Sequence, residues 1–334
     1  MSENKTALPY HIGHISLRWI FALAVCIVAM AFGIYGFSQQ AIHGLSVTGM
    51  RDIGTMKGAP WALYIAIEVY LVGVSFAGIT MAAMVRLFNL KELKTVTRMA
   101  EFLTIIALVS STFCILADVG QPLRALINLP RYARPNSPFF GTFTLVVAGY
   151  LFSSLVYFYL AGRRDAYYMS QKESSLQWFY KLWAAGYTDT PVEQARHHRT
   201  SFWLAIAILP LLVTAHSTLG FVFGLQVGRP GWYGALQGPG FVVLAGISGI
   251  GALAILACFV RFVLHESEKI NLKIFRWLGN FMLLLLLVYL YFMLVEVLTG
   301  VYTGAEKERE VFHNLLFGDY AKLYWTTVFF LAFP

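Results

Sequence analysis

The feature that most constrains this chain is a series of seven apolar runs, each about 20 to 28 residues long. A helix of that length crosses roughly 30 Å of hydrocarbon, because each residue adds about 1.5 Å along the axis. Lipid offers no partner for backbone polar groups, so open strands and loops cannot take the place of these helices. The sequence therefore predicts an all-α integral membrane protein. The seven runs cover residues 17–38, 61–88, 96–117, 138–161, 201–222, 239–262 and 275–298.

An eighth apolar run begins near Tyr320 and continues to Pro334. Its 15 residues are fewer than the roughly 20 that span a bilayer. We therefore expect about eight transmembrane helices, the last of them half-inserted or truncated. The first run has Arg18 at its start and no small-residue cleavage site after its apolar core, so we expect a retained helix and not a signal peptide.

Composition narrows the function. Apolar residues make up 58% of the chain and charged residues only 13%, against roughly 25% charged in soluble domains, which excludes an ordinary soluble enzyme. The net charge of +8 comes from short loops beside the apolar runs, where membrane topology explains it better than nucleic-acid binding. We expect lipid contact and no nucleic-acid partner.

The cysteines and histidines argue against a resident metal centre. Cys26, Cys114 and Cys258 lie in three different runs, and no C-x-x-C-H segment is present. An iron–sulfur cluster or structural zinc site needs about four clustered ligands. Bis-histidine haem needs facing histidines at one depth, whereas His216 alone lies well inside a run. We expect no haem, no iron–sulfur cluster and no metal ligands in this chain.

Loop charges predict the orientation. Cytoplasmic loops collect Lys and Arg. The amino terminus and the loops after the second, fourth and sixth runs hold sixteen of these residues, and the opposite side holds nine. The sequence therefore predicts a cytoplasmic amino terminus.

A weak internal repeat suggests the domain organisation. Phe76-Ala77-Gly78 in the second run resembles Ile247-Ser248-Gly249 in the sixth, about 175 residues later. A duplicated four-helix unit would explain this spacing. We therefore expect two repeated four-helix bundles. They would comprise a first bundle with the functional site at residues 1–165, a cytoplasmic loop at 166–200 and a second, incomplete bundle at 201–334.

Charged side chains inside hydrocarbon are costly and usually mark a site or a pathway. Glu68 lies seven residues into the second run, Asp118 closes the third and Arg124 follows six residues later. His216 lies near the end of the fifth run and Glu296 closes the seventh. By the predicted orientation, all five residues fall in the outer third of the bilayer.

Each of these residues also has a purely structural interpretation. Glu68 can be a buried acid bonded to a neighbouring helix, His216 can join helices by hydrogen bonds, and Glu296 can be solvated at the interface. Asp118 and Arg124 can pair across the turn that Gly120-Gln121-Pro122 favours. The residues alone leave both interpretations open.

The motifs resemble those of the NrfD/PsrC family, the membrane subunits of polysulfide reductase, certain hydrogenases and alternative complex III. The resemblance covers about residues 15–334. It departs from the family at the carboxyl end, where members complete an eighth helix. The matching segments are Pro60-Trp61-Ala62-Leu63-Tyr64 leading to Glu68, Asp118-Val119-Gly120-Gln121-Pro122-Leu123-Arg124, Asn136-Ser137-Pro138, His216-Ser217 and Pro230-Gly231-Trp232.

The resemblance implies a subunit without a redox cofactor of its own, in the cytoplasmic membrane of a bacterium or archaeon. Such a subunit binds a quinone, either menaquinone or ubiquinone, near the outer face. There it exchanges electrons with a ferredoxin-like iron–sulfur subunit on the periplasmic side, in a complex with further catalytic or cytochrome subunits.

The resemblance and the polar residues together give a predicted site. We expect Asp118, Arg124 and Glu68 to handle protons, with Arg124 holding Asp118 ionised. Side chains that could contact the quinone also include Gln121, His43, Trp61, Tyr64 and His216.

Two other functions compete with this one. A secondary transporter or proton-conducting protein would use Glu68 and His216 in an ion path. The sequence argues against it, because no span is plainly broken at mid-depth and the polar groups gather near one face. A simple membrane anchor, in which buried polar groups only pack helices, is the third possibility.

Overall fold

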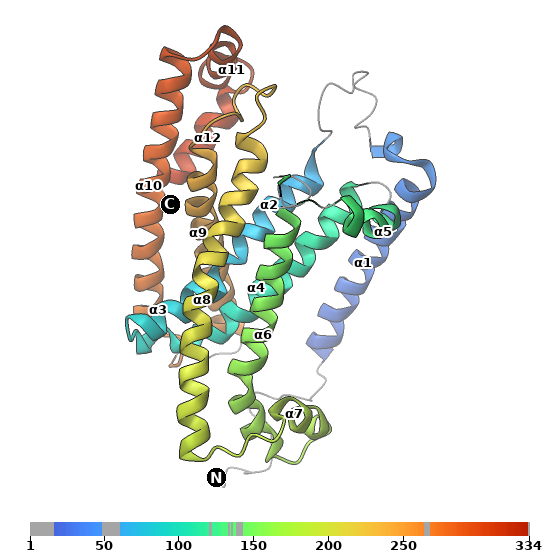
Figure 1. The fold of residues 1–334 in the computed structure, drawn as a ribbon, viewed down its shortest axis with the longest axis vertical. Helices are drawn as coiled ribbons and strands as arrows, with labels where there is room; N and C mark the ends of the chain where they lie inside the picture. Colours follow the sequence, from blue (N-terminus) through green and yellow to red (C-terminus); the bar gives the residue numbers. More distant parts are fainter. Residues whose placement is uncertain are drawn as a thin grey trace. The chain divides into compact units, whose positions relative to one another are not determined.

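A computed structural model describes residues 17–48, 61–119, 122–132, 134, 136–137, 143–263 and 268–332 (Figure 1). Every regular element within these residues is helical. The long helices are α1 (Leu17–His43), α2 (Leu63–Val74), α3 (Phe76–Leu87), α4 (Lys94–Asp118), α6 (Phe143–Ser170), α8 (Pro191–Gly224), α9 (Gln237–Val263) and α10 (Leu272–Tyr302). The shorter ones are η2 (Leu45–Thr48), η3 (Lys91–Leu93), α5 (Pro122–Tyr132), α7 (Gln177–Ala184), α11 (Glu306–Leu316) and α12 (Ala321–Ala332).

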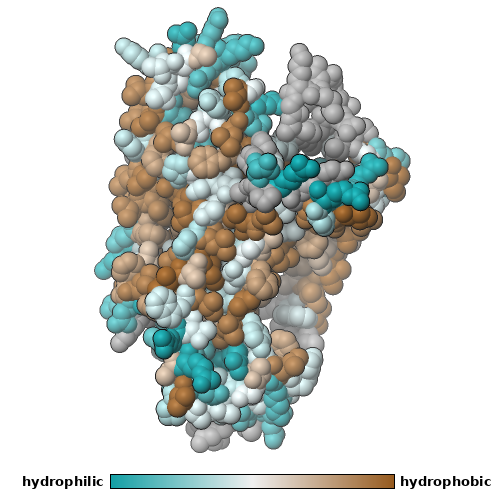
Figure 2. All heavy atoms as spheres, viewed as in Figure 1, coloured by the Kyte–Doolittle hydropathy of each residue, from teal (hydrophilic) through white to brown (hydrophobic). Residues whose placement is uncertain are grey.

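Seven helices in the described residues are long and apolar enough to cross a membrane, counting α2 and α3 as one span. They coincide with the seven predicted runs, which confirms the predicted fold class. Many of their apolar side chains are exposed, including Phe21 (71%) and Phe32 (77%) of α1. Figure 2 shows apolar side chains over much of the visible surface along the long helices. Such a surface is suited to lipid and not to water.

Helices extend beyond the apolar runs at several ends. The predicted loop 166–200 contains the end of α6, the whole of α7 and the first ten residues of α8. Thr190 begins α8, because its Oγ1 accepts a hydrogen bond from the Glu193 amide at 3.3 Å and Pro191 occupies the first helical position. Hydropathy marks only the lipid-embedded part of a helix, so it missed these polar turns.

The chain divides into two compact units that interleave along the sequence. The first unit comprises Met1–Glu68, Ser111–Asn128 and Leu155–Leu204, and the second comprises Val69–Ser110, Leu129–Ser154 and Ala205–Pro334. These boundaries differ from the predicted bundles at 1–165 and 201–334.

The core of the second unit packs α3 and α4 against α9 and α10. Its fully buried side chains are Ala77, Met81, Leu93, Val96, Ala100, Ile250, Leu253, Ala257, Ile270, Ile274 and Leu278. Gly249 of α9 lies against the backbone of the second span. A Cβ added at Gly249 would be 2.9 Å from the Ala77 nitrogen and 3.2 Å from the Gly73 oxygen. The two segments that suggested a repeat therefore pack directly on each other.

The second span contains an irregularity at Ser75, between α2 and α3, that hydropathy does not predict. The span still runs as one helix from Leu63 to Leu87, because Ser75 keeps helical backbone angles and its amide donates to the Leu71 carbonyl at 3.1 Å. The Thr104 hydroxyl of α4 lies at this irregularity, donating to the Ser75 carbonyl at 2.7 Å and accepting from the Gly78 amide at 2.9 Å. The Tyr150 hydroxyl also donates to the Ser75 carbonyl, at 2.9 Å. Side-chain hydroxyls thus replace helical hydrogen bonds here, a known cause of kinks.

Candidate functional site

Gln40 joins three helix ends of the first unit. Its side chain is buried near the end of α1, where Nε2 donates to the Ala117 carbonyl of α4 at 2.6 Å. Its Oε1 accepts a hydrogen bond from the Tyr64 hydroxyl of α2 at 3.2 Å. The last turn of α1, the first turn of α2 and the last turn of α4 therefore meet at one level.

Two carboxyl groups come together just below these ends. Glu68 of α2 is only 2% exposed, and Asp118 of α4 is half-buried. The Asp118 carboxyl is close enough to act electrostatically on that of Glu68, and Glu68 likewise acts on the Cys114 thiol, one turn before Asp118. Within the described part of the chain, Glu68 Oε1 has no hydrogen-bond partner. A buried carboxylate oxygen without a partner is costly, so this corner is a candidate site.

Arg124 does not take the place that the sequence suggested. It lies exposed on α5, where its carbonyl accepts from Asn128 Nδ2 at 2.8 Å. Among the described residues no ion pair joins Asp118 to Arg124. α5 starts at Pro122 and exposes Leu123 and Ile127 together with Arg124. Arg124 therefore lies on an exposed face of the short helix α5, and its guanidinium does not make the predicted pair with Asp118.

The remaining predicted contacts lie at the edge of this corner or outside it. His43 is exposed at the end of α1, and Trp61 is half-buried just before α2. Gln121 lies outside the described residues.

His216 belongs to the second unit. Its ring is buried, with Nδ1 2.7 Å from the Leu212 carbonyl oxygen and Nε2 2.9 Å from that of Val72. The rings of Phe76 and Tyr150 approach it edge-on. Both ring nitrogens are thus occupied by backbone carbonyls, as an interhelical structural role requires.

The comparisons with known proteins agree with the motifs. The sequence model of the family described as "Polysulphide reductase, NrfD" matches residues 52–334. This chain belongs to the NrfD family. The resemblance that the motifs indicated is therefore confirmed.

Three relatives of this NrfD protein are named as parts of oxidoreductases. A protein of Halobacterium salinarum, named as a putative dimethyl sulfoxide reductase membrane subunit, is 28% identical, over 77% of this chain and 55% of its own length. A selenate reductase subunit of Mesobacillus selenatarsenatis is 25% identical, over 83% and 65%. The Hdr-like menaquinol oxidoreductase integral membrane subunit of Archaeoglobus fulgidus is 26% identical, over 94% and 69%. The chain thus spans between about half and two thirds of the relatives' lengths.

Sequence reasoning about this NrfD protein missed Gln40 and Cys114. One feature of the sequence could have identified Gln40: it is a polar residue at the carboxyl end of an otherwise apolar run. Cys114 precedes Asp118 by four residues, so a helix places both on one face. No group of three or more His, Cys, Asp or Glu side chains in the described ranges is placed to hold a metal ion.

Proposed function

We propose that this chain is the quinone-reactive membrane subunit of a respiratory oxidoreductase complex. It exchanges electrons between a membrane quinone or quinol pool and an iron–sulfur subunit on the outer face. The proposal is supported by membership of the NrfD family and by a relative named as a menaquinol oxidoreductase subunit. The observation that carries it is the buried Glu68 carboxyl, whose Oε1 has no hydrogen-bond partner among the described residues and which lies within electrostatic range of half-buried Asp118.

The loop charges support the orientation of this proposal. With a cytoplasmic amino terminus, the end of α1, the start of α2 and the end of α4 face the outer side of the membrane. The site then lies near the periplasmic face, where an iron–sulfur partner could dock. The relatives come from bacteria and archaea, which supports a place in the cytoplasmic membrane of such a cell.

The residues at this corner fit a quinone. When bound, a quinone supplies two-electron, two-proton redox chemistry. The Glu68 carboxyl can hold a proton at Oε1, which no other described residue engages. Half-buried Asp118 can exchange protons between this position and the outer water. The Tyr64 hydroxyl donates its one hydrogen to Gln40 Oε1 at 3.2 Å and can donate to a bound carbonyl when it exchanges that bond, and Trp61 can form part of the wall.

The test measures quinol-linked electron transfer in the assembled complex. We expect Glu68→Gln and Asp118→Asn each to lower turnover by about 10² or more, the usual contribution of a proton-transferring side chain. Glu101→Gln is the matched control, because Glu101 is also a buried glutamate but belongs to the second unit and pairs with Arg98 at 2.6 Å. Normal turnover in both site variants, with the complex assembled, would contradict the proposal.

One observation favours a second function. The irregularity of the second span at Ser75 resembles, on a smaller scale, the discontinuous helices that form the binding sites of secondary transporters. The polar groups there include Thr104 and Tyr150. Proton or solute movement through proteoliposomes that contain this chain without a partner would favour that function.

A further inference from the structure

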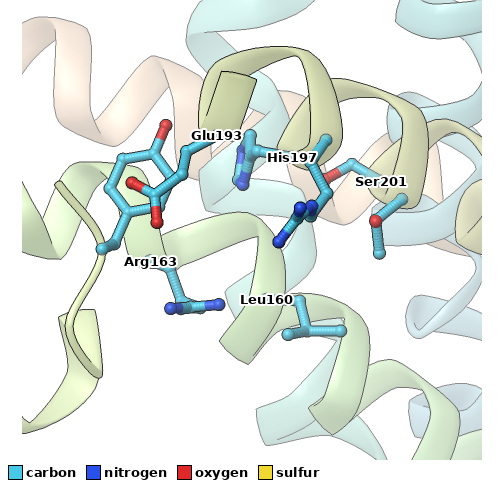
Figure 3. A pocket seen from close by; sticks show the side chains of 8 residues that line it. Leu160, Arg163, Glu193, His197 and Ser201 are labelled. Carbon is cyan, nitrogen blue, oxygen red and sulfur yellow. The ribbon is translucent and has the colours of Figure 1, made fainter. Parts of the chain in front are cut away.

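A second site lies in the first unit, far along the sequence from the carboxyl pair. A cavity of about 230 Å³ opens between the end of α6, the segment after α7 and the start of α8 (Figure 3). It is smaller than the roughly 300–1,000 Å³ of sites for drug-sized ligands, so it suits one small polar group. Its lining residues are Leu160, Arg163, Tyr187, Glu193, Arg196, His197, Thr200 and Ser201.

Helical periodicity explains why α8 supplies most of this lining. Glu193, Arg196, His197 and Thr200 occupy positions i, i+3, i+4 and i+7, which places them on one face of the helix. Figure 3 shows Glu193, His197 and Ser201 along α8, with Arg163 and Leu160 of α6 on the other side of the cavity.

Arg163 makes two hydrogen bonds to the protein and keeps further N–H donors. Its Nε donates to the Ala184 carbonyl at 3.1 Å and its Nη2 to the Ala185 carbonyl at 3.0 Å, at the carboxyl end of α7. The guanidinium carbon also lies 5.8 Å from the centre of the Tyr187 ring. A guanidinium has five N–H donors, and these two hydrogen bonds use two of them, so further donors remain on Arg163, which lines the cavity.

The acidic groups nearby are already engaged. Glu193 Oε2 accepts from the backbone amide and the hydroxyl of Thr188, both at 2.7 Å. Asp189 accepts from the hydroxyls of Tyr168 and Tyr187 and pairs with Arg164 at 3.2 Å. The hydrogen bond from Tyr168 is the main reason that the pKa of Asp189 lies below its ordinary value. Neutral hydrogen-bond donors do not remove the charge of Glu193, so the lining carries one net positive charge, from Arg163 and Arg196 against Glu193.

The short helix α7 supports a position at the membrane surface. Its sequence leaves Trp178 66% and Leu182 70% exposed, while Trp183 turns inward and donates from Nε1 to the Tyr159 carbonyl of α6 at 3.0 Å. Exposed Trp and Leu side chains on a helix beside the ends of two spans are typical of the headgroup level of a bilayer. Trp203, just beyond the cavity on α8, is 59% exposed as well.

We propose that this cavity binds the phosphate group of an anionic phospholipid. Arg196 and the free edge of Arg163 supply charge-assisted hydrogen bonds, and His197, Thr200 and Ser201 line the same space. The glycerol and acyl chains continue outward along the exposed apolar side chains of α7. A phosphate diester carries one negative charge, which matches the positive excess of the two arginines over Glu193.

The experiment compares lipid retention by native mass spectrometry. The full chain is purified and exchanged into nanodiscs or micelles that contain phosphatidylglycerol or phosphatidylcholine, and the lipid that stays bound is counted. We expect Arg196→Gln to weaken phosphatidylglycerol retention about tenfold, the factor that one lost charge-assisted hydrogen bond accounts for. Arg199→Gln is the matched control, since Arg199 is also an exposed arginine of α8 but does not line the cavity.

Three outcomes decide the proposal. Loss of phosphatidylglycerol in Arg196→Gln alone, with phosphatidylcholine unaffected in all variants, supports it. Equal retention in the wild type and both variants overturns it, because general surface charge would then explain the binding. A third arm adds inorganic phosphate without lipid: if phosphate binds the wild type as tightly as phosphatidylglycerol does, the ligand is a soluble anion and the lipid assignment is wrong.

Discussion

Replacing Gly78 with alanine tests how the second span accommodates its irregularity. Gly78 lies where α3 approaches α4 most closely. An added Cβ would lie 2.4 Å from Thr104 Oγ1, 2.7 Å from the Ala100 carbonyl oxygen and 2.9 Å from the Glu101 Cα. Two of these three atoms belong to the backbone of α4. A side-chain rotation therefore cannot make room, and the two helices must move apart.

Three effects set the size of the change. Overpacking a close contact costs about 1–3 kcal/mol. Lengthening the hydrogen bond from the Gly78 amide to Thr104 costs about 0.5–1.5 kcal/mol. Alanine gains roughly 1 kcal/mol over glycine in a helix. The free energy of unfolding should therefore fall by about 0.5–3.5 kcal/mol in Gly78→Ala.

Titration with dodecyl sulfate in mixed micelles measures this change, using the loss of helix signal as the readout. Gly279→Ala in α10 is the matched control, because outside its own stretch of helix no atom of the described residues lies within 4 Å of the Cβ that it would add. That variant should be as stable as the wild type or slightly more stable. The reasoning about the irregularity is refuted if Gly78→Ala unfolds at the same detergent fraction as Gly279→Ala or at a higher one.

Two further predictions concern the first unit. Gln40→Leu removes the donor to the Ala117 carbonyl and the acceptor of the Tyr64 hydroxyl, so it should lower the free energy of unfolding by about 1–3 kcal/mol. Tyr64→Phe removes only one of these two hydrogen bonds, so it should lower the free energy of unfolding by less in the same titration. Equal losses in the two variants would contradict the role given to Gln40. Burial raises the pKa of Tyr187 from 10.0 to about 12. The stability that its neutral phenol contributes should therefore be complete below pH 10 and lost as the pH rises toward 12. The tyrosinate absorbance of the wild type minus that of Tyr187→Phe should show a midpoint near 12, and a midpoint at the ordinary tyrosine pKa would rule this out.

Much of the architecture could be predicted from the sequence. Hydropathy located all seven spans within a few residues at most ends, and the motif from Asp118 to Arg124 identified the family. The same reasoning selected Glu68 and Asp118 from an apolar background, and both belong to the first unit, with Glu68 buried and Asp118 half-buried. It could not find the role of Gln40, because the Ala117 carbonyl that it binds lies 77 residues away and carries no side-chain signal.

The pairing of Asp118 with Arg124 shows the opposite error. Arg124 follows Asp118 by six residues, and the sequence predicts a tight turn that pairs them. Once Pro122 begins a separate helix, α5, that helix sets the direction of the arginine, and Arg124 is exposed on it. A prediction from spacing assumed a local turn, whereas a new element decided the geometry.

The sequence alone determined that this chain is a bundle of membrane-spanning helices, because only helices satisfy their own backbone in lipid and a run of about 20 apolar residues is needed to cross it. The tertiary structure decided which contacts those helices make with one another. The irregularity at Ser75 exists because Thr104 and Tyr150, from two other helices, supply hydroxyls to its backbone. The cavity beside Arg163 and Arg196 likewise depends on how the ends of α6 and α8 pack. Such contacts depend on which residues of different helices lie at the same level, and a local sequence pattern cannot predict this because the residues are far apart in the chain.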